Sequence, residues 1–161
     1  MKLLFALFSL LATAAIGSTT QTFAIYLTNP GNGINYCLDN QGSKDKNFNT
    51  VIGWPCDPSN PTDNELWYFD SGDRIVNYQT GKVLDRYAGK NGNSAAVDIY
   101  ESNWTEAQRW SLNAKGQIIS NGFCLNLQLN GLNDKGYSPV IMWTCNTYWN
   151  SVWKVRGHGS W

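Results

Sequence analysis

Apolar and polar residues alternate along this chain in short runs, separated by stretches rich in glycine, asparagine and serine. The clearest runs are TVIGWPC at 50–56, AVDIYES at 96–102 and PVIMWTC at 139–145. A two-residue period that includes β-branched and aromatic residues predicts strands, and no segment keeps a helical period for more than a few residues. The pattern therefore predicts an all-β protein.

The same features recur three times at a constant interval. Trp67, Trp110 and Trp153 are separated by 43 and 43 residues. Upstream of each lies an apolar triplet that ends in Asp or Asn, namely CLD at 37–39, VLD at 83–85 and CLN at 124–126. A unit of about 43 residues made of short strands cannot bury its apolar face alone. We therefore expect three units to close one shared core, with the three tryptophans packed inside it.

The N-terminus has the parts of a secretory signal peptide. Met1 and Lys2 precede the apolar run LLFALFSLLATAA, and small residues follow in IGS. The run is too short to span a bilayer, which makes a membrane anchor the less favoured alternative. We expect a signal peptide at 1–17 and a secreted, extracellular protein whose single domain is residues 18–161.

Charge and composition narrow the class of partner. Without Lys2 the chain has 11 basic and 12 acidic residues, and it contains no basic patch or charged run. We therefore expect neither nucleic-acid binding nor membrane insertion. Eight tryptophans, eight tyrosines and fifteen glycines, with 15% charged residues, are typical of short strands joined by tight turns.

Four cysteines in a secreted protein predict two disulfides, for which three pairings are possible. Cys37 and Cys56 are 19 residues apart, and Cys124 and Cys145 are 21 apart. These similar separations favour two local bridges, each worth about 3 kcal/mol in the loop-entropy relation. The sequence has no CxxC motif, and its one histidine, His158, lies near the C-terminus, so we expect no metal and no other cofactor.

The recurring CLD, W-x-C and QxW motifs resemble those of the ricin B-type lectins. The resemblance covers roughly residues 22–156; QxW is intact as QRW at 108–110, whereas ELW and SVW are degenerate versions. The middle repeat has Val83 and Ser102 where the others have cysteines, which agrees with one bridge inside each of the other repeats. The resemblance implies a β-trefoil fold and carbohydrate binding.

Sugar recognition in water needs a flat aromatic side chain under the C–H patch of the sugar and fixed carboxylate or amide groups at its hydroxyls. In the lectins that this sequence resembles, these parts are the Asp of CLD, the aromatic two residues before the second Cys, and the Asn three residues before the repeat tryptophan. The resemblance assigns these roles to Asp39, Trp54 and Asn64 in the first repeat, to Asp85, Tyr100 and Ala107 in the second, and to Asn126, Trp143 and Asn150 in the third.

The three sets differ in their polar groups. Asn126 is a weaker acceptor than a carboxylate, and Ala107 cannot donate, so we expect a complete first site, an altered third site and an impaired second site. Gln108, the next residue, is an alternative source of the missing amide, although its side chain is expected to point elsewhere on the strand. Strong binders of the family often carry a Gln two residues before the aromatic; here those positions are Ile52, Asp98 and Ile141.

The expected function is a non-catalytic lectin for glycans or glycoproteins of the galactose or N-acetylgalactosamine type. Trp54 is interpreted as a sugar-stacking residue, because Trp67 and its counterparts already occupy the regular core position. A glycosidase pair is disfavoured, because Asp39 and Asp85 hold equivalent positions in different repeats and threefold symmetry separates them.

Two other interpretations stay open. A β-trefoil such as a protease inhibitor recognises a protein through its loops, and the loops at 57–63 and 128–139 are candidates for that role. A targeting subunit of a toxin or hydrolase would need a separate protein partner. The sequon NWT at Asn103 leaves N-glycosylation open as well.

Overall fold

The computed structural model describes residues 20–129 and 136–158, and within these ranges it contains strands and short 3-10 turns but no α-helix. The strands are β1 Thr22–Thr28, β2 Asn35–Asn40, β3 Asn49–Pro55, β4 Leu66–Phe69, β5 Ile75–Asn77, β6 Val83–Arg86, β7 Val97–Tyr100, β8 Ser111–Leu112, β9 Ile118–Ser120, β10 Phe123–Leu127, β11 Ser138–Thr144 and β12 Lys154–His158. The predicted all-β class is confirmed. The predicted signal peptide at 1–17 lies outside the described residues.

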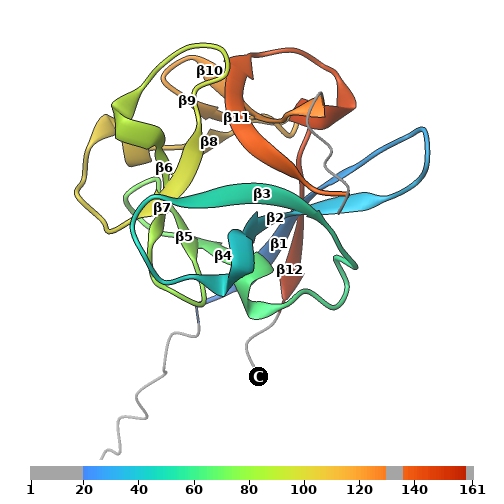
Figure 1. The fold of residues 1–161 in the computed structure, drawn as a ribbon, viewed down its shortest axis with the longest axis horizontal. Helices are drawn as coiled ribbons and strands as arrows, with labels where there is room; N and C mark the ends of the chain where they lie inside the picture. The colour runs from blue at the N-terminus through green and yellow to red at the C-terminus, as the bar shows by residue number, and fades with distance from the viewer. Residues whose placement is uncertain (1–19, 130–135, 159–161) are drawn as a thin grey trace, which may run out of the picture.

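The second and third strands of each repeat form an antiparallel hairpin, namely β2–β3, β6–β7 and β10–β11. The third strands also meet one another, because β3 pairs with both β7 and β11, and Ala96 beside β7 bridges Ile141 of β11. Figure 1 shows β3, β7 and β11 around the centre of the molecule. The three hairpins therefore surround a pseudo-threefold axis.

The first and fourth strands continue the sheet beneath the hairpins. β1 pairs with β12 and with β4, β4 pairs with β5, and β8 pairs with β9. Strands from both ends of the described chain, β1 and β12, thus lie side by side (Figure 1). Three four-strand units joined in this way form the β-trefoil that the sequence predicted.

The repeat tryptophans are the centre of the core, as predicted. Trp67, Trp110 and Trp153 are 0%, 4% and 2% exposed. Their indole Nε1 atoms donate to the backbone oxygens of Leu38, Leu84 and Leu125, over 2.8, 2.9 and 2.8 Å. Each acceptor is the leucine of the triplet in the same repeat. A buried indole needs a partner for its N–H, and the threefold repeat supplies the same partner each time.

Both predicted disulfides are present, Cys37–Cys56 and Cys124–Cys145, with Cα–Cα distances of 5.8 and 4.9 Å. Each bridge joins a cysteine in the first strand of a hairpin, β2 or β10, to the residue that follows the other strand of that hairpin, β3 or β11. The bridges therefore hold the hairpins closed in the first and third repeats. In the described ranges, no helix has the length and apolar character needed to cross a membrane.

Candidate functional site

The predicted site residues gather at one equivalent place in each repeat. The hairpin register pairs Asp39 with Ile52, and a strand turns alternate side chains to opposite faces, so Trp54 lies on the same face as Asp39. The third residue of each set, Asn64 in the first repeat, lies on a short 3-10 turn, which is Asp63–Glu65 in that repeat. The equivalent turns are Glu106–Gln108 and Trp149–Ser151.

In the first repeat, Asp39, Trp54 and Asn64 line one cavity of about 530 Å³. Trp54 is 38% exposed, so part of its ring is open to solvent and the rest is supported by the protein. The side-chain amide of Asn64 donates to Oδ2 of Asp39 over 2.8 Å and is 3.3 Å from the backbone oxygen of Asn40. The carboxyl group of Asp39, oriented by the amide of Asn64, and an aromatic face are therefore held together.

The carboxyl group of Asp39 has an unusual proton affinity. Burial, and then the nearby charge of Glu65, raise its pKa from 3.8 to about 7, although the Asn64 hydrogen bond acts in the opposite direction. Glu65 is itself buried, and its Oε2 accepts from the backbone N–H and the hydroxyl of Thr62 over 2.8 and 3.0 Å. Glu65 occupies the first position of the degenerate QxW motif, and the motif alone predicted no role for it at the site.

In the third repeat, Asn126, Trp143 and Asn150 line a smaller cavity of about 280 Å³. Trp143 is 39% exposed, close to the value for Trp54. The amide of Asn150 donates to the backbone oxygen of Leu127 over 2.9 Å, as the amide of Asn64 does to the residue after Asp39. The amide of the buried Asn126 donates to the backbone oxygen of Cys124 over 3.0 Å, which leaves its side-chain oxygen as the acceptor at the site.

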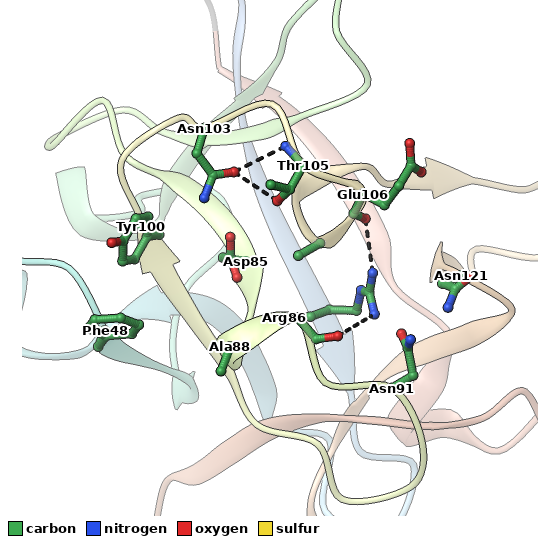
Figure 2. A pocket seen from close by; sticks show the side chains of 12 residues that line it. Phe48, Asp85, Arg86, Ala88, Asn91, Tyr100, Asn103, Thr105, Glu106 and Asn121 are labelled. Atoms are coloured by element: carbon green, nitrogen blue, oxygen red, sulfur yellow. Dashed lines mark hydrogen bonds between the residues drawn. The ribbon is translucent and has the colours of Figure 1, made fainter.

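In the second repeat, Asp85 and Tyr100 line a cavity of about 650 Å³. Figure 2 shows Tyr100 and Phe48 on one side of Asp85, and Arg86 on the other. Ala107, at the position of Asn64, lines the same cavity without a polar group. The structure thus brings together all the residues predicted for each of the three sites.

The expected orientation of Gln108 is wrong. Gln108 lies on the 3-10 turn and not on the following strand, so the alternation of strand side chains does not apply to it. Its buried amide donates to the backbone oxygen of Glu101 over 3.0 Å and lies close enough to the carboxyl of Asp85 to lower the pKa of that group. Burial raises the pKa of Asp85, while Gln108 and the charge of Arg86 lower it. An amide therefore does reach Asp85, from the residue next to Ala107.

A second carboxyl group lies beside Asp85. Asp98 pairs with Asp85 across the β6–β7 hairpin and is 2% exposed, and neither of its carboxyl oxygens has a hydrogen-bond partner among the described residues. Burial, and then the charge of Asp85, raise the pKa of Asp98 to about 7. The equivalent residues, Ile52 and Ile141, are apolar, so the acidic pair is specific to the second repeat.

One group of potential metal ligands exists within the described residues, formed by Cys37, Cys56 and Glu65. The two sulfur atoms are joined in a disulfide, so neither is available as the thiolate that a metal would require. This group does not fit a metal ion.

Solved structures share this fold. The designed threefold-symmetric protein ThreeFoil superimposes with a TM-score of 0.69 at 22% identity, over 83% of this chain and 96% of ThreeFoil. The agglutinin of Abrus precatorius gives 0.67 at 22% identity, over 88% of this chain, which spans only 51% of the agglutinin chain. The C-terminal half of an earthworm R-type lectin, solved with N-acetylgalactosamine, gives 0.64 at 17% identity over 86% and 99% of the two chains.

No curated protein sequence matches the chain. The family model of the ricin-type beta-trefoil lectin domain, in contrast, matches it twice, at residues 15–104 and 75–161. Together these matches span the three repeats and all three candidate sites. The chain therefore belongs to the ricin-type β-trefoil lectin family.

Proposed function

We propose that this protein is a secreted, non-catalytic lectin that binds glycans of the galactose or N-acetylgalactosamine type. The observation that carries the proposal is the first-repeat cavity, where Asn64 donates to Asp39 beside the half-exposed ring of Trp54. A carboxylate accepts strongly from sugar hydroxyls, the side-chain oxygen of Asn64 adds an acceptor, and the indole covers a C–H face.

The sugar class rests on the family and on a relative of the same fold. The earthworm R-type lectin half was solved with N-acetylgalactosamine, and a mutant of that domain with 6'-sialyllactose. Secretion is supported by the apolar N-terminal sequence and by the two disulfides, which persist in oxidising compartments.

The positions of the carboxyl groups disfavour glycoside hydrolysis. Asp39 and Asp85 line different cavities. Asp98 lies next to Asp85 but is buried, and it does not line the cavity. Hydrolysis needs two carboxyl groups that face each other across one sugar linkage, and Asp39, Asp85 and Asp98 do not form such a pair.

The proposal is tested by applying the purified protein to a glycan array and then titrating the strongest ligand by calorimetry. We expect binding to galactose-terminated or N-acetylgalactosamine-terminated glycans, and Trp54→Ala should abolish most of the binding at the first site. Phe69→Ala is the matched control, because Phe69 is also 38% exposed and lines none of the three cavities. If no glycan binds, the proposal is wrong and protein recognition, for instance through the loop at 57–63, becomes the better hypothesis.

A further inference from the structure

The first and second sites each include an aromatic residue from the neighbouring repeat. We call Trp54, Tyr100 and Trp143 the platform aromatics; the residues six positions before them are Phe48, Ser94 and Tyr137. Phe48 of the first repeat contacts Tyr100 of the second, with ring centroids 4.8 Å apart and planes at 62°. Tyr137 of the third repeat contacts Trp54 of the first, at 5.2 Å and 32°. Each pair lines the same cavity as the acid of its site.

The turns that carry these residues are fixed against the neighbouring platform strand. The backbone N–H of Glu101, just after Tyr100, donates to Oδ1 of Asn47 over 3.0 Å. The backbone N–H of Thr144, just after Trp143, donates to Oδ1 of Asn93 over 2.7 Å. These two contacts are equivalent, so the crossing from one repeat to the next is part of the trefoil geometry.

The turn that carries Tyr137 lacks this hydrogen bond to the strand of Trp54. The residue after Trp54 is Pro55, which has no backbone N–H to donate. The position equivalent to Asn47 is Gly136, and a Cβ added there would lie 3.8 Å from Cγ of Pro55. A close approach of backbone to ring replaces the hydrogen bond. Tyr137 is held in addition by Nε2 of Gln41, which donates to its hydroxyl over 3.1 Å.

The turn itself does not require an aromatic side chain. Phe48 has a φ of +63° and Ser94 a φ of +66°, so the same left-handed turn forms with a small residue. A bulky side chain at such a φ is rare and costs free energy. Phe48 nevertheless stays 52% exposed beside Tyr100. Phe48 also contacts Tyr87, at 5.4 Å and 63°, so part of its ring packs within the protein and the exposed part is available for contact with a ligand.

The cavities are larger where the residue at the position of Phe48, Ser94 or Tyr137 is aromatic. The sites with a second aromatic from the neighbouring repeat have cavities of about 530 and 650 Å³, and the third site, where that residue is Ser94, has about 280 Å³. Among the described residues, the second aromatic that lines the third site comes from its own repeat and is the exposed Tyr148.

We propose that Tyr137 and Phe48 are specificity-determining residues that contact a second sugar unit of the bound glycan. The first and second sites then select chains of two or more sugars, with one unit on the platform aromatic and the next against the aromatic of the neighbouring repeat. The third site selects a single unit. This inference rests on the proposed lectin function and adds the length of the ligand to it.

The test compares a monosaccharide with a disaccharide in matched variants. Methyl β-galactoside and lactose are titrated into the protein, and the indole N–H signals of Trp54 and Trp143 in two-dimensional NMR report the first and third sites separately. Tyr137→Ser copies the residue of the third site and should lower lactose affinity at the first site by about fivefold or more, with methyl β-galactoside affinity nearly unchanged. Ser94→Tyr should raise the preference for lactose at the third site.

Phe69→Ser is the internal control, because Phe69 is exposed and lines none of the three cavities, so both affinities should stay unchanged at the first and third sites. An unchanged ratio of lactose to methyl β-galactoside affinity in Tyr137→Ser, or an equal loss of both, overturns the inference while the lectin function stands. The same holds if Tyr137→Ser does not fold and Ser94→Tyr leaves the ratio unchanged. If neither sugar shifts any signal of the unmodified protein, the proposed galactoside binding fails, and this inference fails with it.

Discussion

The side-chain amide of Asn64 donates a hydrogen bond of 2.8 Å to Oδ2 of Asp39, and this contact joins two segments that the sequence separates by 25 positions. Asp39 comes from the end of a strand and Asn64 from a 3-10 turn. The bond holds the carboxyl in one orientation and opposes the rise in its pKa that burial produces. The first site therefore depends on the amide both for geometry and for charge.

Replacing this amide should impair the first site selectively. In Asn64→Ala, the pKa of Asp39 should rise further, because burial and Glu65 then act without opposition, and sugar affinity at neutral pH should fall by about tenfold for the loss of one charge-assisted hydrogen bond. Calorimetry on the unmodified protein and the variant measures the loss. Asn150→Ala is the matched control, since its amide donates to a backbone oxygen and should affect only the third site. Equal losses at both sites would contradict this account.

The two kinds of tryptophan should respond differently to alanine. Trp67→Ala removes a fully buried indole and leaves the oxygen of Leu38 without its donor, so the free energy of unfolding should fall by about 3–5 kcal/mol. Trp54→Ala should change it by less than about 1 kcal/mol, because the ring is partly exposed. Urea denaturation followed by circular dichroism gives both values. If Trp54→Ala proved the more destabilising, the assignment of core and site would be reversed.

The interval of 43 residues was enough to predict much of the fold. The constant spacing of Trp67, Trp110 and Trp153 placed them in equivalent core positions, and the loss of cysteines in one repeat agreed with the pairing Cys37–Cys56. These features depend on order along the chain, which a sequence displays directly. The grouping of Asp39 with its aromatic and amide partners followed from the family motifs for the same reason.

Contacts between repeats could not be predicted in this way. Phe48 reaches Tyr100 only because β3 pairs with β7 in one particular register, and no local pattern encodes that register. The orientation of Gln108 was wrong because a 3-10 turn interrupts the strand alternation on which the expectation relied. One signal was available, however: Phe48 and Tyr137 stand at the same distance before their repeats' platform aromatics.

The buried pair of the second repeat should make folding stability depend on pH. The pKa of Asp98 is raised from 3.8 to about 7, so the folded protein binds more protons than the unfolded chain between about pH 4 and pH 7. Stability should therefore fall as pH rises through this interval and level off above it. Asp98→Asn removes the charge, and its amide can donate to Asp85, so the variant should be more stable above pH 7 by on the order of 2 kcal/mol.

Asp70 provides a control of opposite sign for this experiment. Burial acts to raise the pKa of Asp70, but hydrogen bonds from Arg74 and Gly72 and the charge of Arg74 outweigh it and lower the pKa. Asp70→Asn should therefore lose stability at neutral pH and lose less in acid. Thermal unfolding of both variants from pH 4 to pH 8 gives the comparison. If the stability difference between Asp98→Asn and the unmodified protein does not change with pH, the carboxyl of Asp98 does not titrate in this interval.

Sugar binding should depend on pH at the first site and not at the third. The pKa of Asp39 is raised to about 7, whereas the equivalent residue of the third site, Asn126, has an amide that does not titrate. A protonated carboxyl is a weaker acceptor than a carboxylate, so affinity at the first site should fall when the pH is lowered from 8 to 6. NMR titrations with methyl β-galactoside, read at the indole signals of Trp54 and Trp143, separate the two sites in one sample. Asp39→Asn should give the first site the flat pH profile of the third, and a pH dependence that persists in this variant would show that another group titrates there.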